Sequence, residues 1–274
     1  MEYKEVPAIL TGPAVETPVK SEWASGQTEQ GRNTMKGKVL IYGGSGAVGS
    51  ASAVLLSQMG YGIHLAGLEE DKLKRVAEET GAGISVADVR DPDTFGRVAR
   101  EAGNELAGLI YAVGSINLKS IRRLESEDFL NDFRLNALGA AMAVQAAVPA
   151  LKKNKKASVV LYSSVAVQQG MAMHASLSMA KGAVEGLVRS LAAELAPQVR
   201  VNAIAPSLLQ DSELSSGLIR NQEAADKMAG THAMKRLGRP LDVAQLTAFL
   251  ISDQADWITG QIMGVDGGRS VIQA

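Results

Sequence analysis

Short apolar runs alternate with amphipathic segments along most of the chain, from residue 36 to residue 265. Apolar runs that end in glycine or polar residues are typical of buried parallel strands, and the amphipathic segments between them are typical of crossover helices. The alternation predicts one α/β domain with a doubly wound parallel sheet and helices on both faces. The expected strands are residues 39–42, 62–67, 84–89, 106–114, 157–164, 199–205 and 261–265.

The helical patterns are equally regular, whereas residues 207–238 are polar and irregular and resemble a substrate-side segment. Residues 1–34 carry scattered prolines and charges without sustained periodicity, which predicts a tail or arm outside a domain at 35–274. A proline at 149 is expected to bend or end the longest helix. The expected helices are residues 51–59, 69–80, 91–102, 126–151, 176–195 and 241–252.

A glycine-rich turn joins the first predicted strand to the first helix. Gly44, Gly46 and Gly49 fit the spacing G-x-G-x-x-G, and Gly43, Gly46 and Gly49 fit a related one. Glycine allows positive φ and close approach of a ligand, and the N-terminus of the following helix offers unpaired N–H groups to a pyrophosphate. The turn therefore predicts a dinucleotide site.

Composition narrows the partners. The chain has 28 Lys+Arg against 29 Asp+Glu, so no excess of charge indicates nucleic acid or an anionic membrane surface. The absence of cysteine excludes disulfides and thiolate metal sites, and His64, His174 and His232 are too scattered to indicate a metal centre. The longest apolar stretch is too short to span a bilayer, and the N-terminus lacks a signal-peptide pattern, so a cytoplasmic protein without a metal is expected.

Several blocks together resemble the short-chain dehydrogenase/reductase family over nearly all of residues 36–270. The blocks are Y-G-G-S-G-A-V-G at 42–49, L-N-A at 135–137, S-S-V-A at 163–166, K-G-A-V-E-G-L-V-R-S-L-A-A-E-L-A-P at 181–197, R-V-N-A-I-A-P at 200–206 and I-T-G-Q-I-M-G-V-D-G-G at 258–268. The resemblance implies a single Rossmann-fold domain of about seven strands that binds NAD or NADP. It also implies hydride transfer assisted by an Asn, a Ser, a Tyr and a Lys.

The resemblance assigns roles to individual residues. Asn136 matches the asparagine that holds a proton-relay water, Ser164 the serine that hydrogen-bonds the substrate oxygen, and Lys181 the lysine that binds the nicotinamide ribose. Asp88 matches the residue that contacts the adenine. The coenzyme contacts implied are Gly43, Ser45, Gly46, Val48, Gly49, Asp88, Val89, Ala112, Gly114, Lys181 and Pro206.

One departure concerns the chemistry itself. The family's tyrosine lies four residues before the lysine, and that position is Leu177, which has no proton to give. Loss of a positioned general acid costs about 10²–10⁴ in rate. Tyr162, Tyr111 and His174 are candidate replacements, although a packed aromatic or a loop histidine is the ordinary explanation of each. His174 ranks first because an imidazole ordinarily titrates near neutrality and because His174 lies three residues before Leu177. A bound water is the alternative proton donor.

Two functions follow from these residues. The first is an NAD(P)-dependent oxidoreductase for a small carbonyl or alcohol, with a non-standard proton donor. The presence of Asn136, Ser164 and Lys181 favours this function. The second is a catalytically silent dinucleotide-binding protein, which would act as a sensor or structural partner. Leu177 in place of the tyrosine favours this function. The resemblance further implies a homodimer or homotetramer that pairs through the helices at 126–151 and 176–195.

The form of the coenzyme depends on the end of the second strand. NAD-preferring relatives place an acid there to bind the ribose 2′-hydroxyl. Here Gly67 and Leu68 occupy that end, which favours NADP slightly. No arginine replaces the acid to hold a 2′-phosphate, and Lys72 is a distant candidate.

Overall fold

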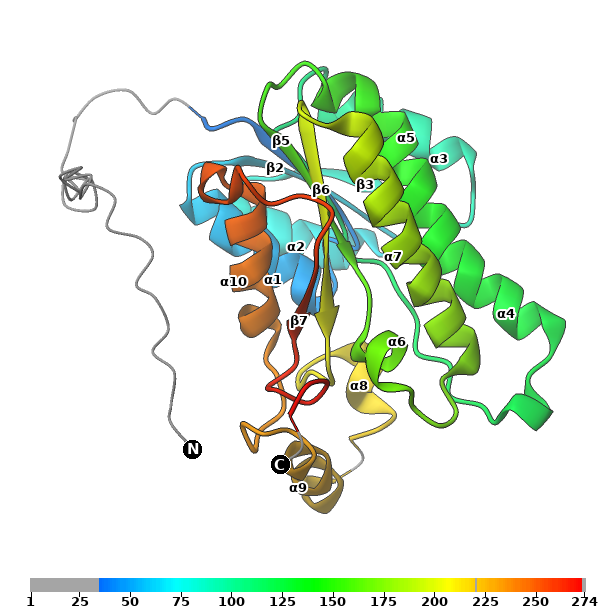
Figure 1. Cartoon of the computed structure of the whole chain (residues 1–274). Coiled ribbons are helices and arrows are strands. Elements are labelled where there is room, and N and C mark those ends of the chain that lie inside the picture. Colours follow the sequence, from blue (N-terminus) through cyan, green and yellow to red (C-terminus); the bar gives the residue numbers. More distant parts are fainter. Residues whose placement is uncertain (1–34, 220, 273–274) are drawn as a thin grey trace, which may run out of the picture. The chain divides into compact units, whose positions relative to one another are not determined.

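The computed structural model describes residues 35–219 and 221–272, and the expected tail or arm at 1–34 lies outside the described residues. Figure 1 shows the sheet between two layers of helices. The described residues form one parallel sheet of seven strands. In the order in which they pair, the strands are β3 (Gly83–Val86), β2 (Gly62–Gly67), β1 (Lys38–Tyr42), β4 (Gly108–Tyr111), β5 (Ala157–Tyr162), β6 (Val199–Pro206) and β7 (Ile262–Val265).

The sheet confirms the predicted doubly wound topology. The chain begins in the middle with β1, continues outward to β3, and then returns to place β4 against the other side of β1. Ile41 of β1 therefore lies between Leu65 of β2 and Ile110 of β4. Such a reversal opens a crevice outside the carboxyl ends of the strands, where α/β proteins of this kind bind ligands.

Two apolar cores, one on each face, hold the helices to the sheet. Side chains alternate between the faces along a strand, so Leu40 of β1 enters one core while Val39 and Ile41 enter the other. The first core packs beneath α3 (Asp93–Ala102), α5 (Gly139–Leu151) and α7 (Ala175–Leu195), and the second beneath α1 (Ala47–Gln58), α2 (Glu70–Thr80) and α10 (Pro240–Ile251).

The helix predicted over 126–151 contains an interruption that the sequence pattern does not show. α4 (Ser126–Phe133) continues through a π-helical turn, η3 (Arg134–Leu138), into α5. The Tyr111 hydroxyl donates a 2.8 Å hydrogen bond to the carbonyl oxygen of Leu135 inside this turn. A Cβ on Gly139 would lie 2.1 Å from the same hydroxyl oxygen, so only glycine fits there. The hydrogen bond of Tyr111 thus holds the helical turn that carries Asn136.

Three strands are shorter than predicted, because their last residues leave the sheet. β3 stops at Val86, β4 at Tyr111 and β5 at Tyr162. The segments beyond them form loops at the carboxyl edge, and the fifth strand is followed directly by α6 (Val165–Gln169). The ends expected for the strands at 84–89, 106–114 and 157–164 were therefore wrong by two or three residues. The residues beyond the true ends belong to loops, which can contribute to a site.

The irregular segment expected at 207–238 is partly helical. It contains α8 (Glu213–Ser216) and α9 (Gln222–Gly230), and Leu209 is anchored by a parallel bridge to Gly238. Across the described residues no helix is both long and apolar enough to cross a membrane. The remaining short helices are η2 (Ile121–Arg123) and η4 (Asp253–Ala255).

Candidate active site

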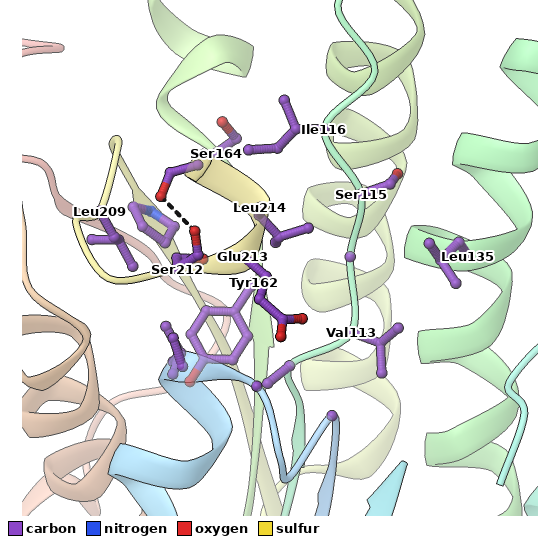
Figure 2. Close-up of a pocket in the computed structure, with 18 of the residues that line it drawn as sticks. Val113, Ser115, Ile116, Leu135, Tyr162, Ser164, Leu209, Ser212, Glu213 and Leu214 are labelled. Carbon is purple, nitrogen blue, oxygen red and sulfur yellow. Dashed lines mark hydrogen bonds between the residues drawn. The ribbon is translucent and has the colours of Figure 1, made fainter. Parts of the chain in front are cut away.

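A cavity of about 840 Å³ opens at the carboxyl edge of the sheet. The loops that follow β1 to β6 line it, and the segment around α8 closes its outer side. Figure 2 shows Ser164, Ser115 and Leu214 around this cavity. Its position at the reversal between β1 and β4 is the one the topology favours for a ligand.

The structure brings together most of the residues predicted for the site. Gly49 and Asn136 are the exceptions, since neither lines the cavity. Lining the cavity are Gly43, Ser45, Gly46, Val48, Asp88, Val89, Ala112, Gly114, Ser164, His174, Lys181 and Pro206.

The backbone of the glycine turn makes contacts that leave no room for a Cβ at two of its glycines. Gly43 has φ +74, in the left-handed region, and a Cβ there would lie 2.8 Å from the Ala112 carbonyl group. A Cβ on Gly49 would lie 2.1 Å from the Gly43 carbonyl oxygen, so Gly49 serves packing within the turn. Gly46 precedes α1, and no side chain caps that helix. The uncapped N-terminus beside the cavity fits a pyrophosphate.

Lys181 carries a buried ammonium group at the centre of the site. The residue is 7% exposed, and its Nζ donates a 2.9 Å hydrogen bond to the carbonyl oxygen of Tyr162. Burial lowers the pKa of Lys181 to about 8, against a smaller opposing effect of the Asp132 carboxylate. The ammonium has two further protons, so it can also hold a ligand hydroxyl in the cavity.

Asn136 lies behind the cavity wall and faces the same point as Lys181. Its Nδ2 donates to the backbone oxygen of Asp132 at 2.8 Å and to Ser115 Oγ at 3.1 Å, whereas its buried Oδ1 has no partner among the described residues. A Cβ placed on Gly114 would lie 3.1 Å from Asn136 Oδ1 and 3.4 Å from Lys181 Nζ. The two polar atoms therefore converge, with an acceptor left unsatisfied between them.

Ser164 is held so that its proton stays available. Its Oγ accepts a 3.2 Å hydrogen bond from the Ala166 N–H and so caps α6. A hydroxyl that accepts at its oxygen can still donate its own proton to a ligand oxygen. The neighbouring Ser163 donates to the buried Glu185 carboxylate at 2.7 Å, which fixes the backbone before Ser164.

Leu177 occupies the cavity wall one turn before Lys181, and no phenol takes its place. Tyr162 lines the cavity, but its hydroxyl bonds Thr247 on α10 at 2.7 Å, and burial raises the pKa of Tyr162 to about 12. The Tyr111 hydroxyl is committed to the helix carbonyl described above, and burial raises the pKa of this phenol strongly. The hydroxyls of both candidate tyrosines are thus bound to partners other than Lys181.

His174 lines the cavity, and one of its two ring nitrogens has no hydrogen-bond partner among the described residues. It precedes α7, and its Nδ1 lies 2.7 Å from the Ala172 carbonyl oxygen, so Nδ1 carries the proton. Within the described part of the chain Nε2 has no hydrogen-bond partner. The imidazolium form would therefore present an Nε2–H donor at the cavity wall.

The opposite end of the cavity is lined by charged residues that are already paired. Asp88 accepts two-pronged hydrogen bonds from Arg90, which hold the pKa of this carboxyl below its usual value. Lys72, the distant candidate for a 2′-phosphate, does not line the cavity; it bonds Glu69 at 2.7 Å and Glu213 at 2.6 Å.

Two residues near the site escaped the sequence analysis. Asp132 and Ser115 lie beside Asn136, and the Ser115 hydroxyl donates to Asp132 Oδ1 at 2.7 Å. No motif marks them, since their meeting depends on how α4 packs beneath the loop after β4. Among the described residues no group of three acidic or histidine side chains could hold a metal ion.

Comparisons with known proteins agree with this geometry. The sequence profile described as enoyl-(acyl carrier protein) reductase matches residues 44–270. Carbonyl reductase family member 4 of Danio rerio is 34% identical, with 85% of this chain and 98% of that protein covered. Versicolorin reductase stcU of Emericella nidulans is 32% identical, with 85% and 96% covered.

A solved structure supports the same assignment. The short-chain type dehydrogenase/reductase of Mycobacterium ulcerans superposes with a TM-score of 0.81 at 27% identity and covers 88% of this chain and 92% of its own. The stretch matched by the sequence profile, residues 44–270, includes Gly46, Ser164 and Lys181. This chain therefore belongs to the short-chain dehydrogenase/reductase family and is an NAD(P)-dependent oxidoreductase of that type.

Proposed function

We propose that this enzyme transfers a hydride between NAD(P) and a small carbonyl or alcohol substrate, with a proton donor other than a phenol. The observation that carries the proposal is the meeting of Ser164, Lys181 and the glycine turn in one cavity, beside Leu177. When bound, the nicotinamide supplies or accepts the hydride. The similarity to carbonyl reductase family member 4 of Danio rerio supports the substrate class.

The chain's own residues divide the remaining work. The Ser164 hydroxyl donates a hydrogen bond to the substrate oxygen and polarises it, since its oxygen is already fixed by Ala166. The Lys181 ammonium binds the ribose, and its charge stabilises negative charge that develops nearby. Asn136 holds a water at its unpartnered Oδ1, close to Lys181.

His174 is the proton donor in this proposal, with a bound water as the alternative. Its Nδ1 is anchored to Ala172, so the ring orientation is set and Nε2 is the atom that exchanges the proton. In the reductive direction Nε2–H passes its proton to the substrate oxygen, which leaves a neutral imidazole and an alcohol. In the oxidative direction the neutral imidazole takes the proton back.

The preferred coenzyme is NADP in this proposal. Gly67 and Leu68 at the end of β2 line the cavity without a carboxylate, and the next residue, Glu69, which also lines it, is ion-paired with Lys72 at 2.7 Å. Arg90 also lines the cavity, so a guanidinium lies on the same side as the expected adenosine end.

We also propose that the enzyme is a homodimer or homotetramer that pairs through α4, α5 and α7. Apolar side chains are exposed along α4, η3 and α7, which is unusual for a surface that faces only water. Light scattering after gel filtration measures the oligomeric state directly. The exposed apolar side chains are Leu130, Phe133, Leu138 and Met179.

Coenzyme binding and turnover test the proposal in sequence. Nicotinamide fluorescence on titration with NADH and NADPH gives the two dissociation constants, and a panel of ketones and aldehydes with the preferred coenzyme then gives turnover. His174→Asn retains a donor toward the Ala172 carbonyl but does not titrate, so it is expected to lower kcat while leaving coenzyme affinity unchanged.

Each result bears on a different part of the proposal. A chain that binds neither coenzyme contradicts it entirely. A His174→Ala variant with full turnover removes the histidine as donor. Binding without turnover on the whole panel, followed by turnover in Leu177→Tyr, identifies a silent coenzyme-binding protein instead.

A further inference from the structure

A buried carboxylate that the proposed reaction does not use lies next to the site. Asp132 on α4 is 3% exposed. Its Oδ1 accepts a 2.7 Å hydrogen bond from Ser115, and its Oδ2 is buried with no partner in the described part of the chain. An ionised carboxylate is costly to bury without compensation. A nearby positive charge would compensate this cost.

Hydrogen bonds connect Asp132 to the surroundings of Lys181. Asn136 Nδ2 donates to the backbone oxygen of Asp132 and to the Oγ of Ser115, so the three residues form one cluster. The other end of the Asn136 amide shares with Lys181 Nζ the space beside Gly114. The cluster of Asp132, Ser115 and Asn136 therefore reaches, through the Asn136 amide, the same space as the Lys181 ammonium.

The charged groups around Lys181 leave Asp132 as its counter-charge. Glu185, one turn further along α7, is bound to the hydroxyl of Ser163. From β5, Tyr162 presents its backbone oxygen, and its phenol points to α10. His174 lies at the N-terminus of α7, before the first turn of the helix. The negative charge of the Asp132 carboxylate opposes the effect of burial and raises the pKa of Lys181.

We propose that Asp132 is a positioning residue that acts through Lys181: its carboxylate keeps the buried ammonium charged, and Ser115 and Asn136 hold the carboxylate in place. The inference rests on the proposed role of Lys181 at the coenzyme ribose. It also gives Lys181 a function in a site where Leu177 replaces the tyrosine. With no phenol to tune, the task of Lys181 is to remain protonated for coenzyme binding and for charge stabilisation.

The titration of Lys181 itself gives a direct test. The apo enzyme is labelled with [ε-¹³C]lysine, the Lys181 signal is assigned with Lys181→Arg, and its chemical shift is followed against pH. Asp132→Asn keeps the acceptor for Ser115 and removes the charge. The midpoint is expected to fall by about one pH unit, the lower end of the effect of a nearby opposite charge. Asp256→Asn, a change of an exposed aspartate beside η4, is expected to leave it unchanged.

The pH dependence of coenzyme binding is the second readout. The pH at which affinity for NAD(P)H is half lost is expected to fall by the same amount in Asp132→Asn. An unchanged Lys181 titration overturns the inference, even if coenzyme affinity falls. Failure of the proposed function looks different, because a chain that binds no coenzyme still reports the titration of Lys181.

A stability cycle covers the case in which the single variant folds poorly. Asp132→Asn leaves the ammonium without its counter-charge, and Lys181→Met leaves the carboxylate without one, so each is expected to lower the thermal midpoint. The double variant removes both charges and is expected to lose less than the sum of the two. Additive losses would contradict a direct interaction between the charges.

Discussion

Leu177 lies one helical turn before Lys181 on α7, and both side chains line the same cavity. Leu177 is 4% exposed and Lys181 is 7% exposed, so both side chains are almost completely buried in the wall of the cavity. Side chains four residues apart stack on one face of a helix. A hydroxyl at position 177 would therefore lie near the ammonium, and this enzyme has a methyl-bearing side chain there instead.

In the His174→Ala background, Leu177→Tyr is expected to raise kcat by about 10²–10⁴ on ketone substrates, because it restores a positioned general acid. The Lys181 charge beside the new phenol would lower the pKa of the phenol and so favour proton exchange. Leu177→Phe adds the ring without the hydroxyl and is expected to give no such gain. Steady-state kinetics of the two variants at equal coenzyme saturation measure the difference, and equal rates would count against this geometry.

The pKa of Lys181, about 8, predicts how coenzyme affinity depends on pH. Below pH 8 the amine is charged and can bind the ribose in its proposed role, whereas above pH 8 it loses its proton. The dissociation constant of NAD(P)H is therefore expected to rise with pH above 8, by up to about tenfold per unit in the limit of complete dependence on the charge. Fluorescence titrations from pH 6 to pH 10 measure this.

Lys181→Arg separates the charge from other effects of high pH. A guanidinium stays protonated throughout this range, so the variant is expected to bind more weakly but without the change above pH 8. The same pH dependence in the arginine variant would assign it to another group.

The sequence pattern was sufficient to locate the strands along the chain but not to give the exact surroundings of the site. Buried parallel strands are continuous apolar runs, so their positions in the sequence could be read directly. Ser164 was predicted inside a strand, yet it leaves the sheet and caps α6. The π-helical turn around Asn136 depends on Tyr111, which is distant in sequence. Asp132 becomes relevant only through packing against the loop that carries Ser115.

Two neighbouring tyrosines allow a prediction about the helix turn itself. The Tyr111 hydroxyl donates to the Leu135 carbonyl oxygen, whereas the buried Tyr42 hydroxyl has no partner among the described residues. Tyr111→Phe is expected to destabilise the fold by about 1–2 kcal/mol, since it leaves a carbonyl unsatisfied. Tyr42→Phe removes an unsatisfied hydroxyl and is expected to be neutral or stabilising. Urea unfolding of both variants measures the two free energies, and equal losses would contradict the assigned hydrogen bond.

The end of β2 provides a test of how the coenzyme lies in the cavity. Leu68 follows β2, lines the cavity and is largely exposed, so substitutions there should leave folding intact. Leu68→Arg offers a guanidinium to a 2′-phosphate, and Leu68→Asp offers a carboxylate to a 2′-hydroxyl. A hydrogen bond to a charged group contributes about 1.5–3 kcal/mol, which corresponds to roughly 10- to 100-fold in affinity. The ratio of the NADH and NADPH dissociation constants is expected to move toward NADPH in the arginine variant and toward NADH in the aspartate variant. If neither substitution moves the ratio, the adenosine ribose does not lie at the end of β2, and the orientation assigned to the coenzyme is wrong.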